Sequence, residues 1–325
     1  MAQKYTRFDT ENQIKEATKD MSTFYRANCV NYTGTTFKSD GGEYYTEIVS
    51  EYLLDNYDLF DQIKTIKRDN YKIETHNGTT PRTISNRKEE RIALAMYGKN
   101  IWPIGKIIDY QVPLKSKQAD GAGKIDLIAF DESTGILRLI ELKAPKANDT
   151  LLRCVLEIFT YRKIVDKDAL IKSYELDGKC TEIRICPLFF KDSKQDKEYE
   201  DFANRLGKYN KLMSKLQQKP RNCLFFVELM NRIRFDISKV ELLRFPFTDA
   251  KLVSNAQVSS SKATKTADGT SVSSAMAQAG NACPTGPIVM LPIYEQPNGF
   301  PLALEEVTNC ETETLEKWEI EILDY

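Results

Sequence analysis

Two adjacent apolar segments joined by a short turn constrain the fold of this chain most strongly. Residues 123–132 (GKIDLIAFDE) and 136–145 (ILRLIELKAP) each read as a strand, and the polar turn DESTG between them predicts a β-hairpin. In front of them, residues 105–115 (GKIIDYQVPLK) alternate in polarity, which predicts a third strand. We therefore expect a sheet at the centre of the fold.

Two more strands and several helical segments flank these three strands in the sequence. Residues 182–190 and 223–230 read as two more strands around a basic helical segment. The order of elements predicts an α/β protein with a central mixed β-sheet flanked by helices, an N-terminal helical region and a C-terminal extension. We expect Asn148 or Asp149 to cap the helix after the hairpin. The four segments with helical spacing are 11–26, 43–60, 85–98 and 148–165.

Composition divides the chain into four parts. Residues 1–80 are expected to form a helical region, and residues 81–253 to form the core that contains the sheet. Residues 254–286 are rich in Ser, Ala, Thr and Gly, which is typical of a flexible linker. Residues 287–325 form an acidic C-terminal extension. One large domain with appendages is thus expected.

Histidine and cysteine usage excludes several kinds of catalytic site. The only histidine, His76, lies in a turn-rich stretch, where we expect it to be solvated. A single histidine excludes the two-histidine zinc helix and the three-histidine zinc site. The seven cysteines contain no CxxC pair and are expected to be reduced and mostly buried. Any chemistry must therefore depend on carboxylates, lysines and a metal ion.

Hydropathy and charge narrow the location and the partners. No apolar run approaches the roughly 20 residues that cross a bilayer, and the polar N-terminal segment has no signal-peptide core. A cytoplasmic protein without a membrane partner is expected. The net charge of −1 gives no global attraction to nucleic acid, so a polyanion would need a local basic surface.

The hairpin brings charged residues together on one face. Asp126 and Glu141 lie on its two strands, and Lys143 points to the same face as Glu141 by strand periodicity. Neighbouring carboxylates repel unless a cation lies between them, and Mg²⁺ accepts such oxygens together with backbone carbonyls such as that of Leu142. A lysine beside a metal-bound water can orient that water for attack on phosphorus.

At these residues the chain resembles the PD-(D/E)XK nuclease superfamily, over roughly residues 80–190. The resemblance implies a restriction-endonuclease-like core in which Asp126, Glu141 and Lys143 are catalytic and the two carboxylates hold the metal. It also implies a glutamate from the preceding helix, for which Glu89 and Glu90 are candidates and Glu90 is favoured.

One branch of this family carries Gln-x-x-x-Tyr on the helix that follows. Here Glu157 replaces the glutamine and Tyr161 is kept, so Tyr161 is a further candidate site residue. Residues four apart share one face of a helix, which would place both side chains toward the hairpin. Glu157 could alternatively pair with Arg153 or Lys143.

The resemblance implies a Mg²⁺-dependent nuclease, with Mn²⁺ as a substitute, that hydrolyses phosphodiester bonds of DNA in defence, repair or mobile-element biology. Two alternatives stay open: a catalytically silent nucleic-acid-binding module and a phosphodiesterase acting on RNA or nucleotides. A homodimer is also left open. A basic run is the candidate phosphate-binding surface. Its candidate residues are Lys208, Lys211, Lys215, Lys219 and Arg221.

Overall fold

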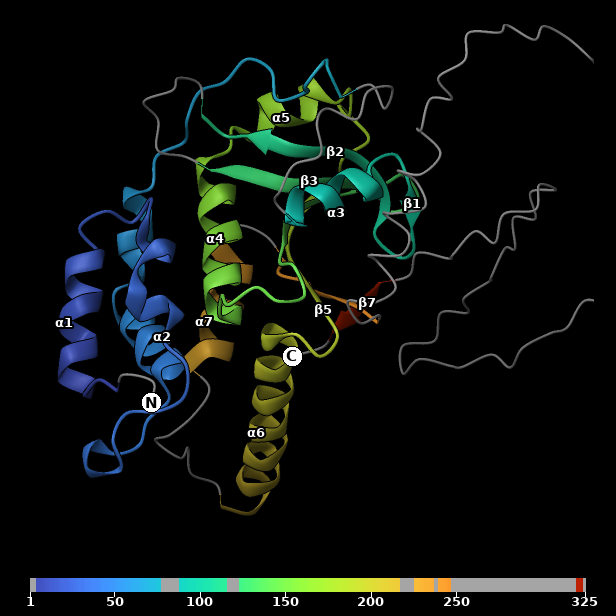
Figure 1. Ribbon diagram of the computed structural model, residues 1–325. Coiled ribbons are helices and arrows are strands. Elements are labelled where there is room, and N and C mark those ends of the chain that lie inside the picture. Colours follow the sequence, from blue (N-terminus) through green and yellow to red (C-terminus); the bar gives the residue numbers. More distant parts are fainter. Residues whose placement is uncertain are drawn as a thin grey trace, which may run out of the picture. The chain divides into compact units, whose positions relative to one another are not determined.

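A computed structural model describes residues 4–76, 88–115, 123–216, 225–236, 239–246 and 320–323. Seven strands in these ranges form one sheet, in the order β1-β2-β3-β4-β5-β6-β7 (Figure 1). The strands are β1 (Asn100–Ile101), β2 (Gly105–Pro113), β3 (Lys124–Asp131), β4 (Ile136–Leu142), β5 (Glu182–Phe190), β6 (Leu242–Phe245) and β7 (Glu321–Leu323).

The sheet is mixed, as the order of elements predicts. Strands β1 to β4 pair antiparallel, β4 to β6 pair parallel, and β7 pairs antiparallel with β6. Strand β7 belongs to the predicted C-terminal extension, so the end of that extension adds a strand to the sheet. The predicted linker, residues 254–286, lies outside the described residues.

The predicted hairpin of β3 and β4 is confirmed. Leu127 pairs with Ile140, and the pairing continues to Asp131 opposite Ile136. The turn requires Gly135, which has φ +70° and whose added Cβ would lie 2.7 Å from the Lys179 carbonyl oxygen. The hairpin therefore has a fixed register, which decides which side chains share a face.

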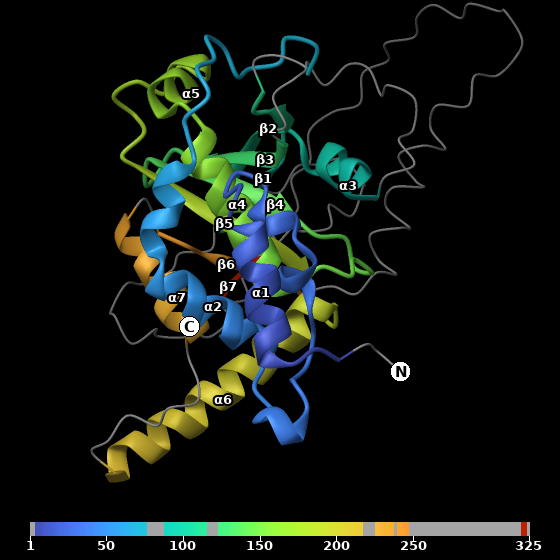
Figure 2. The ribbon, with the colours of Figure 1, turned by 90° about the vertical axis from the view of Figure 1, so that its left-hand side faces the viewer.

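Helices cover both faces of the sheet (Figures 1 and 2). The helix α4 packs on β4 and β5, while α3 packs on β2 and β3. Because strand residues alternate, Leu139 joins the core under α4, whereas Ile140 joins the core under α3. The helices are α1 (Arg7–Ala17), α2 (Tyr45–Asp55), α3 (Lys88–Met96), α4 (Leu151–Ile164), α5 (Lys167–Ser173), α6 (Lys194–Leu216) and α7 (Phe225–Asp236).

One predicted strand is wrong. Residues 223–230 read as an apolar strand, but Phe225–Asp236 forms the helix α7. Leu229, Met230 and Ile233 are all fully buried, and this spacing of one and three residues is helical. The apolar run of residues 223–230 is short enough for a strand, but Ile233, which lies beyond its end, continues the buried face of a helix.

Several helix ends also differ from the expectation. The helix α1 begins at Arg7 and ends at Ala17, because Thr6 and Asp9 form a capping box that fixes its start. The helix α4 is capped by Thr150, whose side chain accepts from the Arg153 N–H, and not by Asn148 or Asp149. No helix in the described ranges is both long and apolar enough to cross a membrane.

Candidate active site

The carboxylate of Asp126 lies against the end of β4. Its Oδ2 accepts from the Leu142 N–H at 2.9 Å, and its Oδ1 accepts from Gln111 Nε2 at 2.7 Å. The pair Leu127–Ile140 makes Asp126 and Glu141 the next opposite positions of the hairpin. Both side chains therefore face α4, which confirms the predicted shared face.

Lys143 lies between carboxylates from two elements. Its Nζ donates to Glu141 Oε1 at 2.7 Å and to Glu157 Oε2 at 2.9 Å, and lies 3.5 Å from Asp149 Oδ2. Lys143 is only 6% exposed. Burial acts to lower the pKa of Lys143, but Glu141 and the other acidic neighbours outweigh burial and raise it. Lys143 therefore stays protonated at neutral pH.

The cluster has more carboxylates than cations. Among the residues that the structure describes, the buried Glu141 Oε2 has no hydrogen-bond partner. Burial, with Asp126 and Glu157 nearby, raises the pKa of Glu141 well above its ordinary value. Burial likewise raises the pKa of Asp126 to about 7, although Lys143 acts in the opposite direction. A divalent cation would relieve this repulsion, so the donor set fits one.

The cluster fits a divalent cation only in part, because the ammonium group of Lys143 already binds some of its carboxylate oxygens. Among the described residues, no group of three or more His, Cys, Asp and Glu side chains is arranged to hold a metal ion. The ammonium of Lys143 takes up one oxygen each of Glu141 and Glu157. The groups that could hold Mg²⁺ are Asp126, the unpaired oxygen of Glu141 and the backbone carbonyl of Leu142, completed by water.

Of the two candidate glutamates on α3, Glu89 contacts the end of the hairpin. Its Oε1 accepts from the Ala144 N–H at 3.2 Å, and its charge contributes to the raised pKa of Asp126. The sequence pattern favoured Glu90. A helix that crosses the strand end turns one of two adjacent side chains toward it, and residue spacing alone does not decide which.

A hydrogen-bonded chain leads from Lys143 to the N-terminal region. Tyr161 donates to Glu157 Oε1 at 2.9 Å, and its hydroxyl lies 3.2 Å from the Tyr25 hydroxyl. Arg26 Nε donates to the same Tyr25 oxygen at 2.8 Å. Tyr161 thus lies with the cluster, as expected, and the replacement of glutamine by Glu157 gives Lys143 a second acidic partner.

Gln111, Gly123 and Tyr25 lie at the site, but no sequence pattern predicts them there. Gln111 adopts φ +50°, which non-glycine residues rarely do, and this places its amide on Asp126. Gly123 leaves no room for a side chain, because an added Cβ would lie 2.1 Å from the Tyr161 hydroxyl. The helical pattern also gives no reason to place Tyr25 beside Tyr161, which is distant in sequence.

The expectation that His76 is solvated is wrong. Its Nδ1 lies 2.6 Å from Asp109 Oδ1, its side chain is 14% exposed, and its ring stacks on Tyr110 with centroids 3.9 Å apart. Asp109 also accepts from the Tyr174 hydroxyl at 2.6 Å. The segment that carries His76 runs along β2, so the imidazole finds a buried partner.

The predicted phosphate-binding run lies largely outside what the structure describes. Residues 208, 211 and 215 belong to α6, in agreement with the predicted helix. The side chains of Lys208, Lys211 and Lys215, and all of Lys219 and Arg221, lie outside the described part.

Comparisons of the chain with protein-family models, with curated proteins and with solved structures found no match.

Proposed function

We propose that the protein is a divalent-metal-dependent nuclease of the PD-(D/E)XK kind, with a restriction-endonuclease-like core and DNA as its favoured substrate. The observation that carries the proposal is the buried, unpaired oxygen of Glu141 next to Asp126. A buried carboxylate oxygen without a donor is costly, and a site that binds a cation gives such an oxygen a function.

Bound Mg²⁺ would stabilise negative charge on the phosphoryl oxygens and lower the pKa of a coordinated water. Asp126 and Glu141 supply the charge that holds the ion. Gln111 and the Leu142 N–H keep the Asp126 carboxylate in place through their hydrogen bonds. The support of a ligating carboxylate by such donors is common at metal sites.

Lys143 supports the reaction as a hydrogen-bond donor and not as a base, because its raised pKa keeps it protonated. Two of its three N–H groups are engaged by Glu141 and Glu157. Asp149 Oδ2 lies 3.5 Å from the same nitrogen, and the third N–H would turn from it to orient the attacking water or to neutralise charge on the phosphate. The chain through Tyr161 and Tyr25 fixes Glu157, and thereby Lys143.

One observation favours a second candidate, a silent nucleic-acid-binding module. The ammonium of Lys143 already neutralises part of the acidic cluster without any metal. In that case the protein would bind nucleic acid and leave it intact.

The test is incubation of the purified protein with plasmid, single-stranded DNA and RNA, with and without Mg²⁺. Cleavage that requires Mg²⁺ and disappears in Asp126→Asn supports the proposed function. The matched control is Glu132→Gln, which removes one carboxylate from the exposed hairpin turn and should leave the rate unchanged. Binding without cleavage of any of the three substrates would favour the silent module.

A further inference from the structure

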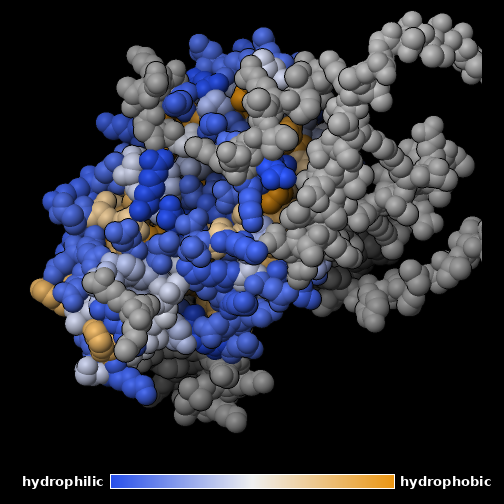
Figure 3. Space-filling model, viewed as in Figure 1, coloured by the Kyte–Doolittle hydropathy of each residue, from blue (hydrophilic) through white to orange (hydrophobic). Residues whose placement is uncertain are grey.

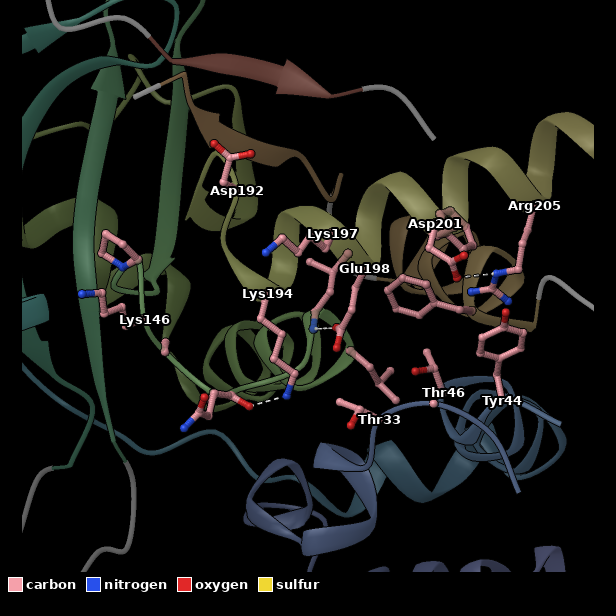
Figure 4. A pocket seen from close by; sticks show the side chains of 18 residues that line it. Thr33, Tyr44, Thr46, Lys146, Asp192, Lys194, Lys197, Glu198, Asp201 and Arg205 are labelled. Atoms are coloured by element: carbon pink, nitrogen blue, oxygen red, sulfur yellow. Dashed lines mark hydrogen bonds and ion pairs between the residues drawn. The ribbon is translucent and has the colours of Figure 1, made fainter. Parts of the chain in front are cut away.

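A groove separate from the carboxylate cluster lies between α6, the loop before α4 and the N-terminal region. Its volume is about 750 Å³, within the range of ligand-binding sites. Lys146 lines it and lies three residues after Lys143, so one end of the groove adjoins the candidate active site. Figure 4 shows Lys146 and Lys194 toward this end, and Tyr44 with Arg205 at the other.

Three carboxylates line the groove: Glu198 and Asp201 contact other groups, and Asp192 is exposed. Glu198 Oε2 accepts from the Leu151 N–H at 2.7 Å, and Asp201 Oδ2 lies 3.1 Å from Arg205 Nε. Lys194 donates to the Asn148 carbonyl oxygen, a neutral acceptor, and also interacts electrostatically with Glu198. Three lysines (Lys146, Lys194 and Lys197) and two carboxylates (Asp192 and Glu198) line this end, and the surplus of cations suits an anionic ligand.

The opposite end carries an arginine that pairs with Glu47 and Asp201 and stacks on an aromatic ring. The Arg205 guanidinium lies over the Tyr44 ring, 4.1 Å from its centroid, and Glu47 Oε1 fixes Arg205 from 3.0 Å. Tyr44 itself is 37% exposed. Unpaired bases stack on aromatic rings and on arginine planes, whereas bases within a duplex are stacked on each other.

The surrounding surface is also polar. On the face shown in Figure 3, hydrophilic residues dominate the coloured area, and hydrophobic residues form only small separate patches. A charged polymer fits this surface better than an apolar partner does.

We infer that this groove binds a single-stranded segment of nucleic acid, with phosphates at the lysine end and a base stacked on the Tyr44–Arg205 pair. The inference rests on the proposed function for the identity of the polymer and adds a preference for single strands. Lys146 and Lys197 are both exposed and would contact the phosphates next to the scissile bond.

The experiment measures binding of the full chain to a fluorescent single-stranded oligonucleotide and to the matching duplex, in EDTA so that no cleavage occurs. The double variant Lys146→Gln/Lys197→Gln should reduce the salt slope for the single strand by about 1.4, because each single-strand phosphate contact contributes about 0.7. Tyr44→Ala should weaken single-strand binding about tenfold.

The matched control is Lys172→Gln/Lys179→Gln, which removes two exposed lysines away from the groove and should leave the slope for the single strand unchanged. Unchanged affinity and slope in the groove variants, or tighter binding of the duplex, would overturn the inference. A Mg²⁺ cleavage assay on the parent chain separates the two proposals. If the parent chain cleaves DNA and the groove variants bind it normally, only the groove proposal is refuted. If binding depends on the groove but no cleavage occurs, only the nuclease proposal is refuted.

Discussion

Strand β4 contributes to two buried ionic clusters with opposite charge balance. At one, Arg138 Nε donates to Glu241 Oε2 at 2.7 Å, and Arg184 donates to Glu241 Oε1. At the other, Glu141 shares Lys143 with Glu157 and keeps one oxygen unpaired. Burial acts to raise the pKa of both glutamates, but the two arginines lower that of Glu241, whereas nearby carboxylates raise that of Glu141 further.

The comparison separates a cluster whose charges are paired from one with surplus carboxylates, for which we propose a cation as the ligand. A carboxylate whose two oxygens each accept from a cation has no remaining need for a metal. A carboxylate that faces other carboxylates lowers stability until a cation binds. Strand β4 therefore contributes to both kinds of cluster, and the charges around Glu241 and Glu141 distinguish the paired cluster from the acidic one.

The largest expected effect is at Glu241. Glu241→Gln removes the charge that pairs with Arg138 and Arg184, and should lower the free energy of unfolding by about 3–5 kcal/mol. Chemical denaturation at pH 7 measures it. Because the pKa of Glu241 is lowered in the fold, its stabilisation is present above its unfolded pKa and is lost as the pH falls. A loss below about 1 kcal/mol would contradict the structural role.

A smaller loss of stability is expected when Lys143 is removed. Lys143→Met leaves Glu141 and Glu157 without the ammonium group that hydrogen-bonds to both, at a cost of about 2–3 kcal/mol at pH 8. Glu241→Gln leaves two arginines that stay charged, whereas Lys143→Met leaves carboxylates that can take up a proton. The loss of stability in Lys143→Met should therefore become smaller as the pH falls toward 5. Denaturation curves at both pH values check this. An equal loss at both would mean that the two carboxylates do not repel.

The next effect concerns the pH dependence of stability without divalent metal. The pKa of Asp126 is raised to about 7, so the folded chain holds a proton that the unfolded chain releases near pH 4. Stability should therefore fall as the pH rises from about 4 to about 7 and level off above that. Asp126→Asn should reduce this slope, and Glu132→Gln should not. A slope unchanged by Asp126→Asn would refute the assignment.

The smallest effect is expected at His76, which provides a reference for an ordinary buried polar contact. His76→Gln should lower the free energy of unfolding by about 1 kcal/mol, because Asp109 keeps its bonds from the Tyr174 hydroxyl and the Tyr110 N–H. Thermal unfolding compared with the parent chain measures it. A loss as large as that of Glu241→Gln would show that the contact between His76 and Asp109 is more than an ordinary buried hydrogen bond.

Local patterns were sufficient to predict the hairpin and the residues that it brings together. Two apolar segments around the DESTG turn predict the hairpin of β3 and β4, and its register places Asp126 opposite Glu141. The helix pattern of 148–165 likewise placed Glu157 and Tyr161 on one face. These inferences needed only neighbours along the chain or across one turn.

Contacts between residues far apart in the sequence could not be predicted from such local patterns. Tyr25 reaches Tyr161 across 136 positions, and His76 reaches Asp109 across 33. Gln111 depends on an unusual backbone angle that its residue type does not favour. The misread segment 223–230 shows a further limit, because a short apolar run suits a strand or a buried helix equally well.

The most direct test of the account is a calorimetric titration of the full chain with Mg²⁺ at pH 6 and pH 8. We expect saturable binding that is tighter at pH 8, where Asp126 is ionised, and that is lost in Asp126→Asn but retained in Glu132→Gln. Absence of binding by the parent chain, or equal affinity in Asp126→Asn, would contradict the claim that the surplus carboxylates at the end of β4 hold a divalent cation.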